Sequence, residues 1–275
     1  MIRLGLVGYP LEHSLSPKIH LAALKSSGLQ GDYSLFPVSP DEKQGLEDLL
    51  ARVRSGEITG LNVTIPHKQN VIPFLDELTP TARAIGAVNT VYPYENKLLG
   101  HNTDVQGFMF DLKRFIGDRE LGIGNRRSAL VLGAGGSARA VVYALKNDGW
   151  NITVAARRIE QAQELASHYN SVEPIELASE IRPSKFQLVV NTTPVGMTPN
   201  VSRSPWPGGL PFPHQAMIYD LVYNPRATKL VKDACAAGLS ATTGLGMLIE
   251  QAALSFEIWT DFNPSRSALF ESINH

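Results

Sequence analysis

A glycine-rich turn between a strand and a helix constrains this chain more than any other feature. The apolar run Ser128–Leu132 leads directly into Gly133-Ala134-Gly135-Gly136-Ser137-Ala138, and helical periodicity then continues to Asn147. In this G-x-G-x-x-A pattern the first glycine permits a tight turn, the second lets the backbone approach a pyrophosphate, and the small last residue keeps the helix close to the sheet. The N–H groups at the helix start attract phosphate. The context therefore favours a dinucleotide-binding unit over an ordinary glycine turn.

The strand that follows indicates which dinucleotide is bound. A site for NAD carries an Asp or Glu about 20 residues after the glycines, where it binds the ribose 2′-hydroxyl. Here the strand ends in Val154-Ala155-Ala156-Arg157-Arg158, and the nearest acid downstream is Glu160. Two guanidinium groups in that place favour the 2′-phosphate of NADP, although they could also simply solvate the start of a helix. We therefore expect NADP as the cofactor.

Strand-like apolar runs alternate with helical periodicity along almost the whole chain, which is typical of an α/β protein. A length of 275 residues is sufficient for two domains with a core each. Two strands about Glu95-Asn96 are predicted to form a hairpin. The Gly-rich, charged segment Gly117–Arg127 is predicted to be a linker at a domain boundary. The helical patterns 245–259 and 264–273 could belong to either domain.

Composition excludes several classes of protein. The 25 basic and 26 acidic residues give a net charge of −1, so no general attraction to nucleic acid or to an anionic membrane is expected. No apolar run is long enough to span a membrane, and the N-terminus does not resemble a signal peptide, so we expect a cytoplasmic protein. The seven histidines are scattered without metal-ligand spacing, which predicts no metal site. The single cysteine, Cys235, is expected to be buried in a helix.

Seven polar motifs remain that composition does not explain. They are Tyr9–Pro17, Asn62–Lys68, Gly86–Thr90, Gly100–Asp104, Asn191–Met197, Tyr219–Pro225 and Gly244–Gln251. In order and spacing, and over nearly the whole length, the chain resembles the shikimate dehydrogenases. The resemblance implies an open α/β substrate-binding domain at residues 1–104, completed by C-terminal helices at 245–275. It also implies a Rossmann-like, doubly wound NADP-binding domain at residues 105–244.

The resemblance also implies roles for individual residues. Lys68 and Asp104 correspond to the catalytic pair. The substrate-binding positions are Ser14, Ser16, Asn62, Thr64, Asn89, Asp104, Tyr223 and Gln251. The cofactor-binding positions are Gly133, Ala134, Gly135, Gly136, Ser137, Ala155, Ala156, Arg157, Arg158, Leu221 and Gly244. One departure is that the family often has Asn-Arg-Thr where this chain has Ala156-Arg157-Arg158, which removes an amide and a hydroxyl and adds a positive charge.

The implied reaction is the reversible reduction of 3-dehydroshikimate to shikimate by NADPH. A proton donor must serve the developing alkoxide, and a lysine held against a carboxylate can supply that proton. We expect Lys68 to end a strand and Asp104 to begin a helix, although a purely structural ion pair would leave the same signature. Alternatives are a quinate/shikimate dehydrogenase of the same family that prefers quinate or uses both substrates with NAD, a methylene-tetrahydrofolate dehydrogenase, and a non-catalytic NADP-binding sensor. The expected partner is a small molecule, and both a monomer and a homodimer remain open.

Overall fold

The computed structural model describes residues 1–119, 127–177 and 181–274. The chain divides into two compact units, of which unit 1 comprises Met1–Gly107 and Ile249–His275 and unit 2 comprises Phe108–Leu248. Both boundaries fall inside helices, namely α5 (Asp104–Ile116) and α9 (Leu245–Thr260). The first of these boundaries, between Gly107 and Phe108, therefore lies before the segment Gly117–Arg127, where the sequence predicted a linker. Residues 120–126 of that segment lie outside the described residues.

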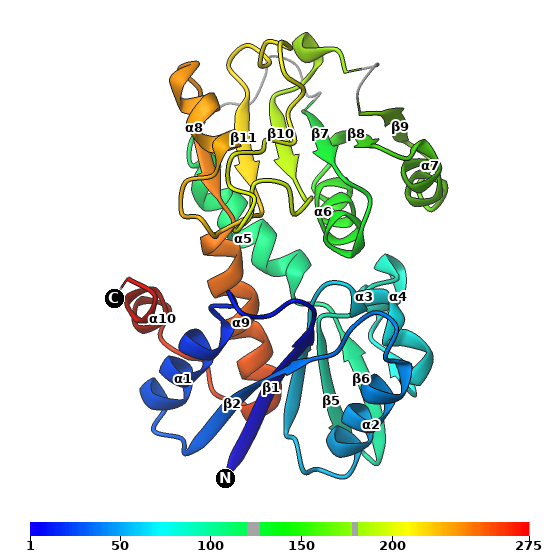
Figure 1. The fold of residues 1–275 in the computed structure, drawn as a ribbon, viewed down its shortest axis with the longest axis vertical. Coiled ribbons are helices and arrows are strands. Elements are labelled where there is room, and N and C mark those ends of the chain that lie inside the picture. Colours follow the sequence, from blue (N-terminus) through cyan, green and yellow to red (C-terminus); the bar gives the residue numbers. More distant parts are fainter. Residues whose placement is uncertain (120–126, 178–180, 275) are drawn as a thin grey trace. The chain divides into compact units, whose positions relative to one another are not determined.

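Unit 1 contains a mixed, six-stranded sheet with the order β2-β1-β3-β5-β6-β4 (Figure 1). Its strands are β1 (Ile2–Gly8), β2 (Gly31–Pro37), β3 (Gly60–Val63), β4 (Glu77–Leu78), β5 (Thr90–Tyr94) and β6 (Lys97–His101). β1, β2 and β3 are parallel, whereas β5 runs antiparallel to β3 and β6. Glu95 and Asn96 have φ values of 48° and 63°, which a two-residue hairpin turn requires, so the predicted hairpin is confirmed.

The helices of unit 1 come from both ends of the chain. They are α1 (Ser16–Ser26), α2 (Lys43–Arg54), α3 (His67–Asn70), α4 (Pro80–Ile85) and α10 (Arg266–Ser272), with a 3₁₀ turn at Ile72–Phe74. α10 packs on α1. In α9, Trp259 lies against Gly60, where any side chain would overlap the indole, and its Nε1 donates to the Val91 carbonyl at 3.2 Å. The C-terminal helices therefore complete the core of unit 1, which their periodicity alone did not decide.

Unit 2 contains a parallel sheet with the order β12-β11-β10-β7-β8-β9. Its strands are β7 (Ser128–Leu132), β8 (Asn151–Ala156), β9 (Val172–Glu176), β10 (Leu188–Asn191), β11 (Met217–Asp220) and β12 (Ala241–Thr243). Numbered along the chain, this is the 3-2-1-4-5-6 order of the doubly wound dinucleotide-binding fold, so the predicted fold class is confirmed. The order reverses between β7 and β10, and ligands bind such sheets at that point, outside the carboxyl ends of the strands.

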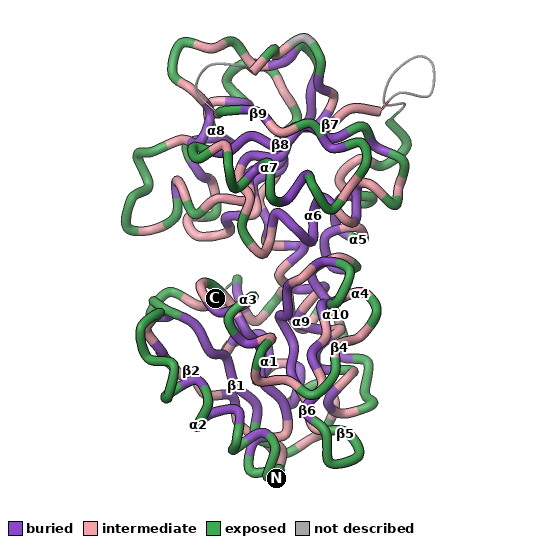
Figure 2. The backbone as a smooth tube through the Cα atoms, turned by 90° about the vertical axis from the view of Figure 1, so that its right-hand side faces the viewer, coloured by how far each residue is buried: buried purple, intermediate pink, exposed green. Residues whose placement is uncertain are grey.

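Helices α6 (Gly136–Asn147), α7 (Ile159–Ser167) and α8 (Lys229–Ala236) pack against this sheet, and a 3₁₀ turn occupies Pro183–Lys185. The central strands of both units are buried, and exposed residues concentrate in the connections (Figure 2). This pattern is the one that a parallel sheet covered by helices imposes, because both of its faces must be apolar.

Two local expectations are corrected by the structure. Lys68 does not end a strand: β3 stops at Val63, and Lys68 lies in the short helix α3. Cys235 is exposed, because α8 turns Leu230, Val231 and Ala234 inward instead. In the described part of the chain, no helix is long and apolar enough to cross a membrane.

Candidate active site

An ion pair between Lys68 and Asp104 lies at the centre of the polar residues of unit 1. Lys68 Nζ is 2.6 Å from Asp104 Oδ2, and the two side chains are only 14% and 5% exposed. α3 supplies the lysine, and the first residue of α5 supplies the carboxylate, as the sequence predicted for Asp104. A negative charge in the first turn of a helix is favoured by the helix dipole. The pair is therefore held away from bulk water, where its electrostatic interaction is strong.

Asn89 fixes the other oxygen of this carboxylate. Its Nδ2 donates to Asp104 Oδ1 at 3.0 Å and to Gln251 Oε1 at 3.3 Å, and its Oδ1 accepts from the Thr103 backbone N–H at 2.8 Å. Lys68 is held in turn by a backbone hydrogen bond, in which its carbonyl accepts from the Val88 N–H at 2.8 Å. Four of the predicted site residues, Lys68, Asn89, Asp104 and Gln251, are thus joined in one network.

Asn62 belongs to the same network through a residue that the sequence did not reveal. Asn62 Nδ2 donates to Ser255 Oγ and to the Asn89 carbonyl, both at 3.1 Å. Ser255 is fully buried, and its Oγ also lies within hydrogen-bond distance of Thr90 Oγ1 and Thr103 Oγ1. Since Ser255 follows Gln251 by one helical turn on α9, its spacing was the only available signal, and that signal is also typical of a residue in an ordinary core.

A second residue missed at the sequence level is Tyr33, whose hydroxyl donates to Asn62 Oδ1 at 2.9 Å. The ring of Tyr33 stacks on His20 with a centroid distance of 4.4 Å and an interplanar angle of 6°. Burial lowers the pKa of His20 to about 3, so this imidazole is neutral at physiological pH. Tyr33 therefore orients the Asn62 amide from a rigid aromatic stack.

Ser14, Ser16 and Thr64 follow the carboxyl ends of β1 and β3. Ser14 Oγ accepts from the Ser16 N–H at 3.3 Å, and Ser16 is 7% exposed at the start of α1. The Thr64 N–H donates to the Val7 carbonyl at 2.9 Å, which aligns the segment after β3 with the end of β1. β1 and β3 are neighbours in the sheet, so the segments that carry these hydroxyls begin at adjacent strand ends.

The glycine turn of unit 2 suits a dinucleotide phosphate. Gly133 has φ +108°, and a Cβ there would lie 2.7 Å from Thr192 Oγ1 in the loop after β10. Only glycine therefore allows the turn to come so close to that loop. A Cβ at Gly135 would meet no atom within 4 Å, which leaves the backbone accessible. Gly135 precedes α6, and no side chain caps this helix start. Backbone N–H groups are thus placed where phosphate binds in such folds.

The remaining cofactor positions of unit 2 also follow strand ends. Ala155 and Ala156 are buried in β8, and the Arg157 and Arg158 side chains that follow are exposed. Leu221 follows β11, and its carbonyl packs so closely on Gly244 that no side chain could replace that glycine's hydrogen. The predicted substrate residue Tyr223 lies in unit 2, two residues after Leu221. The residues present therefore fit an NADP molecule.

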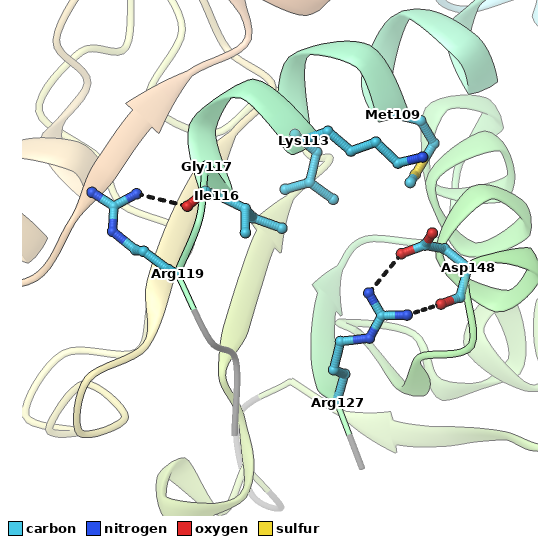
Figure 3. A pocket seen from close by; sticks show the side chains of 8 residues that line it. Met109, Lys113, Ile116, Gly117, Arg119, Arg127 and Asp148 are labelled. Carbon is cyan, nitrogen blue, oxygen red and sulfur yellow. Dashed lines mark hydrogen bonds and ion pairs between the residues drawn. The ribbon is translucent and has the colours of Figure 1, made fainter. Parts of the chain in front are cut away.

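A separate pocket of about 230 Å³ in unit 2 is not part of these sites (Figure 3). It is lined by Met109, Leu112, Lys113, Ile116, Gly117, Arg119, Arg127 and Asp148. Two of its guanidinium groups already bind protein oxygens, because Arg127 pairs with Asp148 and Arg119 donates to carbonyls of α5. No predicted site residue lines it. Over the described ranges, no cluster of three or more His, Cys, Asp or Glu side chains is placed to bind a metal.

Comparison with known proteins identifies the family. Residues 6–91 match the shikimate dehydrogenase substrate binding domain, residues 117–185 match the shikimate / quinate 5-dehydrogenase family, and residues 244–269 match the shikimate 5'-dehydrogenase C-terminal domain. The NADP-dependent shikimate dehydrogenase of Salinibacter ruber is 41% identical over 98% of this chain and 95% of its own length.

Solved structures agree with this match. A crystal structure of shikimate 5-dehydrogenase from Thermus thermophilus, in complex with NADP(H) and shikimate, has a TM-score of 0.86 and 39% identity over 99% of this chain and 98% of that one. A quinate dehydrogenase from Corynebacterium glutamicum in complex with NAD has the same TM-score at 32% identity, over 99% and 98% of the two chains. Three matching segments, full-length sequence similarity and the shared fold confirm the resemblance stated above: the chain belongs to the shikimate dehydrogenase family.

Proposed function

We propose that this protein catalyses the NADP-dependent, reversible reduction of 3-dehydroshikimate to shikimate. The observation that carries this proposal is the buried Lys68–Asp104 pair at 2.6 Å, held by Asn89 in a network of polar residues. Full-length relatives that are named NADP-dependent shikimate dehydrogenases support it. A family member that had become a non-catalytic NADP sensor would have no need to preserve this pair.

Lys68 is the general acid in this proposal. NADPH supplies the hydride to the carbonyl carbon when it is bound. The Lys68 ammonium donates a proton to the carbonyl oxygen as negative charge develops there, and the amine takes that proton back from the hydroxyl in the reverse reaction. Asp104 keeps the ammonium oriented, and its carboxylate also offers acceptor lone pairs to a neighbouring hydroxyl of the substrate. Such a positioned acid contributes roughly 10²- to 10⁴-fold to turnover.

Unit 1 binds the substrate in this proposal. Ser14 and Ser16 donate their hydroxyls to the substrate carboxylate. The ring hydroxyls contact Asn62, Thr64, Asn89, Asp104 and Gln251, with Tyr223 of unit 2 as a further contact. The network of hydrogen bonds around Asn62 and Asn89 supports these roles, because it fixes the two amides before any substrate arrives.

Unit 2 binds NADP in this proposal. The backbone of Gly133, Ala134, Gly135, Gly136 and Ser137 receives the pyrophosphate. Ala155 and Ala156 line the adenosine, Arg157 and Arg158 pair with the 2′-phosphate, and Leu221 and Gly244 contact the nicotinamide side. The exposure of both arginine side chains supports this, since a 2′-phosphate must be met at the solvent edge of the sheet.

A quinate dehydrogenase that uses NAD is the second candidate, because such an enzyme shares this fold with a TM-score of 0.86. The test is to incubate the purified protein with shikimate or quinate, each with NADP or NAD, and to follow the nicotinamide absorbance. Fast turnover only with shikimate and NADP supports the proposal. Quinate turnover within a few-fold of shikimate favours the second candidate, and no turnover in any of the four mixtures contradicts both.

We further propose that the enzyme acts in the cytoplasm on its small-molecule substrate, without binding nucleic acid or membrane. The near-neutral charge of the chain supports this. Light scattering on the purified protein would establish whether it is a monomer or a homodimer.

A further inference from the structure

Asp220 is a buried carboxylate at the last position of β11. It is 0% exposed, and three donors converge on it. Asn191 Nδ2 at 2.7 Å and the Val222 N–H at 3.0 Å donate to Oδ1, and Thr228 Oγ1 donates to Oδ2 at 2.6 Å. Burial disfavours the charge of a carboxylate, and these three hydrogen bonds offset part of that cost.

The first donor connects Asp220 to the glycine turn. Asn191 ends β10, which lies beside β11 in the sheet (Figure 1). Asn191 Oδ1 accepts from the Thr193 N–H at 2.9 Å and from Thr193 Oγ1 at 2.7 Å. Gly133 packs against this same loop, since its absent Cβ would lie 2.9 Å from Thr193 Cγ2. The carboxylate therefore fixes, through one amide, the loop that the pyrophosphate-binding turn rests on.

The other two donors connect Asp220 to the loop after β11. The Val222 N–H bond turns the chain directly after Leu221, whose carbonyl meets Gly244. Thr228 caps α8, because its Oγ1 accepts from the Val231 N–H at 3.3 Å. Its hydroxyl hydrogen is the one donated to Asp220. The loop is thus held at both its beginning and its end by one side chain.

We propose that Asp220 is a positioning residue for NADP, whose ionised carboxylate holds the loops after β10 and β11 in the arrangement that receives the cofactor. This assignment rests on the proposed function. Asp220 does not touch the reacting atoms. It acts through Asn191, Val222 and Thr228 on the two loops that pack against Gly133 and Gly244.

The charge of Asp220 is set by its surroundings. Its neighbours across the sheet are Asn191 on β10 and Thr243 on β12, and Thr228, the N-cap of α8, donates to it, so these described neighbours of Asp220 are all uncharged and non-titrating. Burial raises the pKa of Asp220 to about 6. The carboxylate accepts all three hydrogen bonds above that pH. Once protonated, it must donate from one oxygen, which reverses the bond with Thr228 and loosens the loop after β11.

The test is the affinity for NADP, measured by calorimetry at pH 7.5 and pH 5 with the full-length wild type and with Asp220→Asn, which has the shape of the protonated side chain. We expect the variant to bind NADP about 10-fold more weakly at pH 7.5, the worth of one charge-assisted hydrogen bond. The ratio should approach one at pH 5, where the wild type is protonated as well. The 2′-phosphate also titrates near pH 6, but it does so equally with both proteins.

The control is Asp148→Asn, which removes a carboxylate of unit 2 that pairs with Arg127 at the far end of α6. It should bind NADP like the wild type at both pH values. Asp220→Asn should also unfold at a temperature no lower than the wild type at pH 7.5, because it removes a buried charge. If Asp220 only stabilised the fold, NADP affinity would fall only together with thermal stability. A loss of NADP affinity alone therefore indicates a positioning role.

A measurement without any variant gives an independent check. NAD lacks the 2′-phosphate, so its affinity for the wild type should fall severalfold as the pH drops through about 6. A flat NAD profile, or equal NADP affinities of wild type and Asp220→Asn at pH 7.5, would overturn the assignment while leaving the proposed function intact. Absence of NADP binding by the wild type would overturn both.

Discussion

Replacing Lys68 with methionine should reduce both turnover and stability, and the structure explains why the two effects must be separated. The substitution leaves Asp104, 5% exposed, with Asn89 as its remaining donor in the network. An uncompensated buried charge costs about 3–5 kcal/mol when its partner is removed. Loss of the general acid should lower kcat by roughly 10²- to 10⁴-fold. A stable but inactive Lys68→Met protein is therefore not the expected result.

The double variant Lys68→Met/Asp104→Asn separates the two effects. The amide keeps an oxygen for the Asn89 donor and carries no charge, so urea unfolding should show that at least about 2 kcal/mol of the lost stability returns. Turnover should stay at the level of Lys68→Met, because the proton donor is still missing. The combination measures the structural worth of the pair independently of its chemistry.

Lys97→Met is the matched control in the same unit. Lys97 pairs with Glu77, but the two side chains are 53% and 49% exposed, and such a surface pair contributes about 0–1 kcal/mol. This variant should unfold and turn over like the wild type. If kcat of the double variant recovers together with its stability, Lys68 is only a structural ion-pair partner, and the catalytic reasoning is refuted.

Three further outcomes are expected. Replacing Arg157 and Arg158 together with alanine should lower the preference for NADP over NAD in kcat/KM by roughly 10²-fold, whereas equal losses for both cofactors would mean that neither arginine contacts the 2′-phosphate. Ser14→Ala and Ser16→Ala should each weaken shikimate binding by about 1–3 kcal/mol in calorimetry, and unaltered binding would show that the substrate carboxylate does not contact these serines. The wild type should prefer shikimate to quinate by about 10²-fold in kcat/KM. Burial lowers the pKa of His20 to about 3, so the unfolded chain takes up the proton first and stability falls by about 1.4 kcal/mol per pH unit below about 6.5. Urea unfolding of His20→Phe between pH 6.5 and 4.5 should lack this loss, and an unchanged slope would show that His20 is not its source.

Much of the fold could be predicted because its signals are local. The strand Ser128–Leu132, the turn beginning at Gly133 and the helix that begins at Asp104 were all predicted where the structure places them. Periodicity and glycine placement specify such elements within one stretch of chain. The shortest elements escaped prediction, among them α3, which carries Lys68, and the two-residue strand β4. Such elements form because neighbouring segments of the fold pack against them, and no local sequence pattern encodes this packing.

The candidate site divides in the same way. Motifs pointed to Lys68 and Asp104, but Ser255 and Tyr33 carried no signal of their own. A serine on a buried helix and a tyrosine on a buried strand are common in any protein core. Their roles arise from hydrogen bonds to Asn62 across sequence separations of 193 and 29 residues. Only folding brings such donors and acceptors to within 3.1 Å of each other.

The sequence by itself determined the α/β class, the dinucleotide turn, the family and the identity of the proposed acid and carboxylate, because each of these depends on residues that are neighbours along the chain or repeat with a fixed period. The tertiary structure decided which unit the C-terminal helices complete, how deeply the Lys68–Asp104 pair is buried, and that Asp220 is enclosed by neutral donors from three segments. Burial and desolvation depend on what packs around a group from distant parts of the chain, and they set both the charge of a carboxylate and the cost of breaking an ion pair.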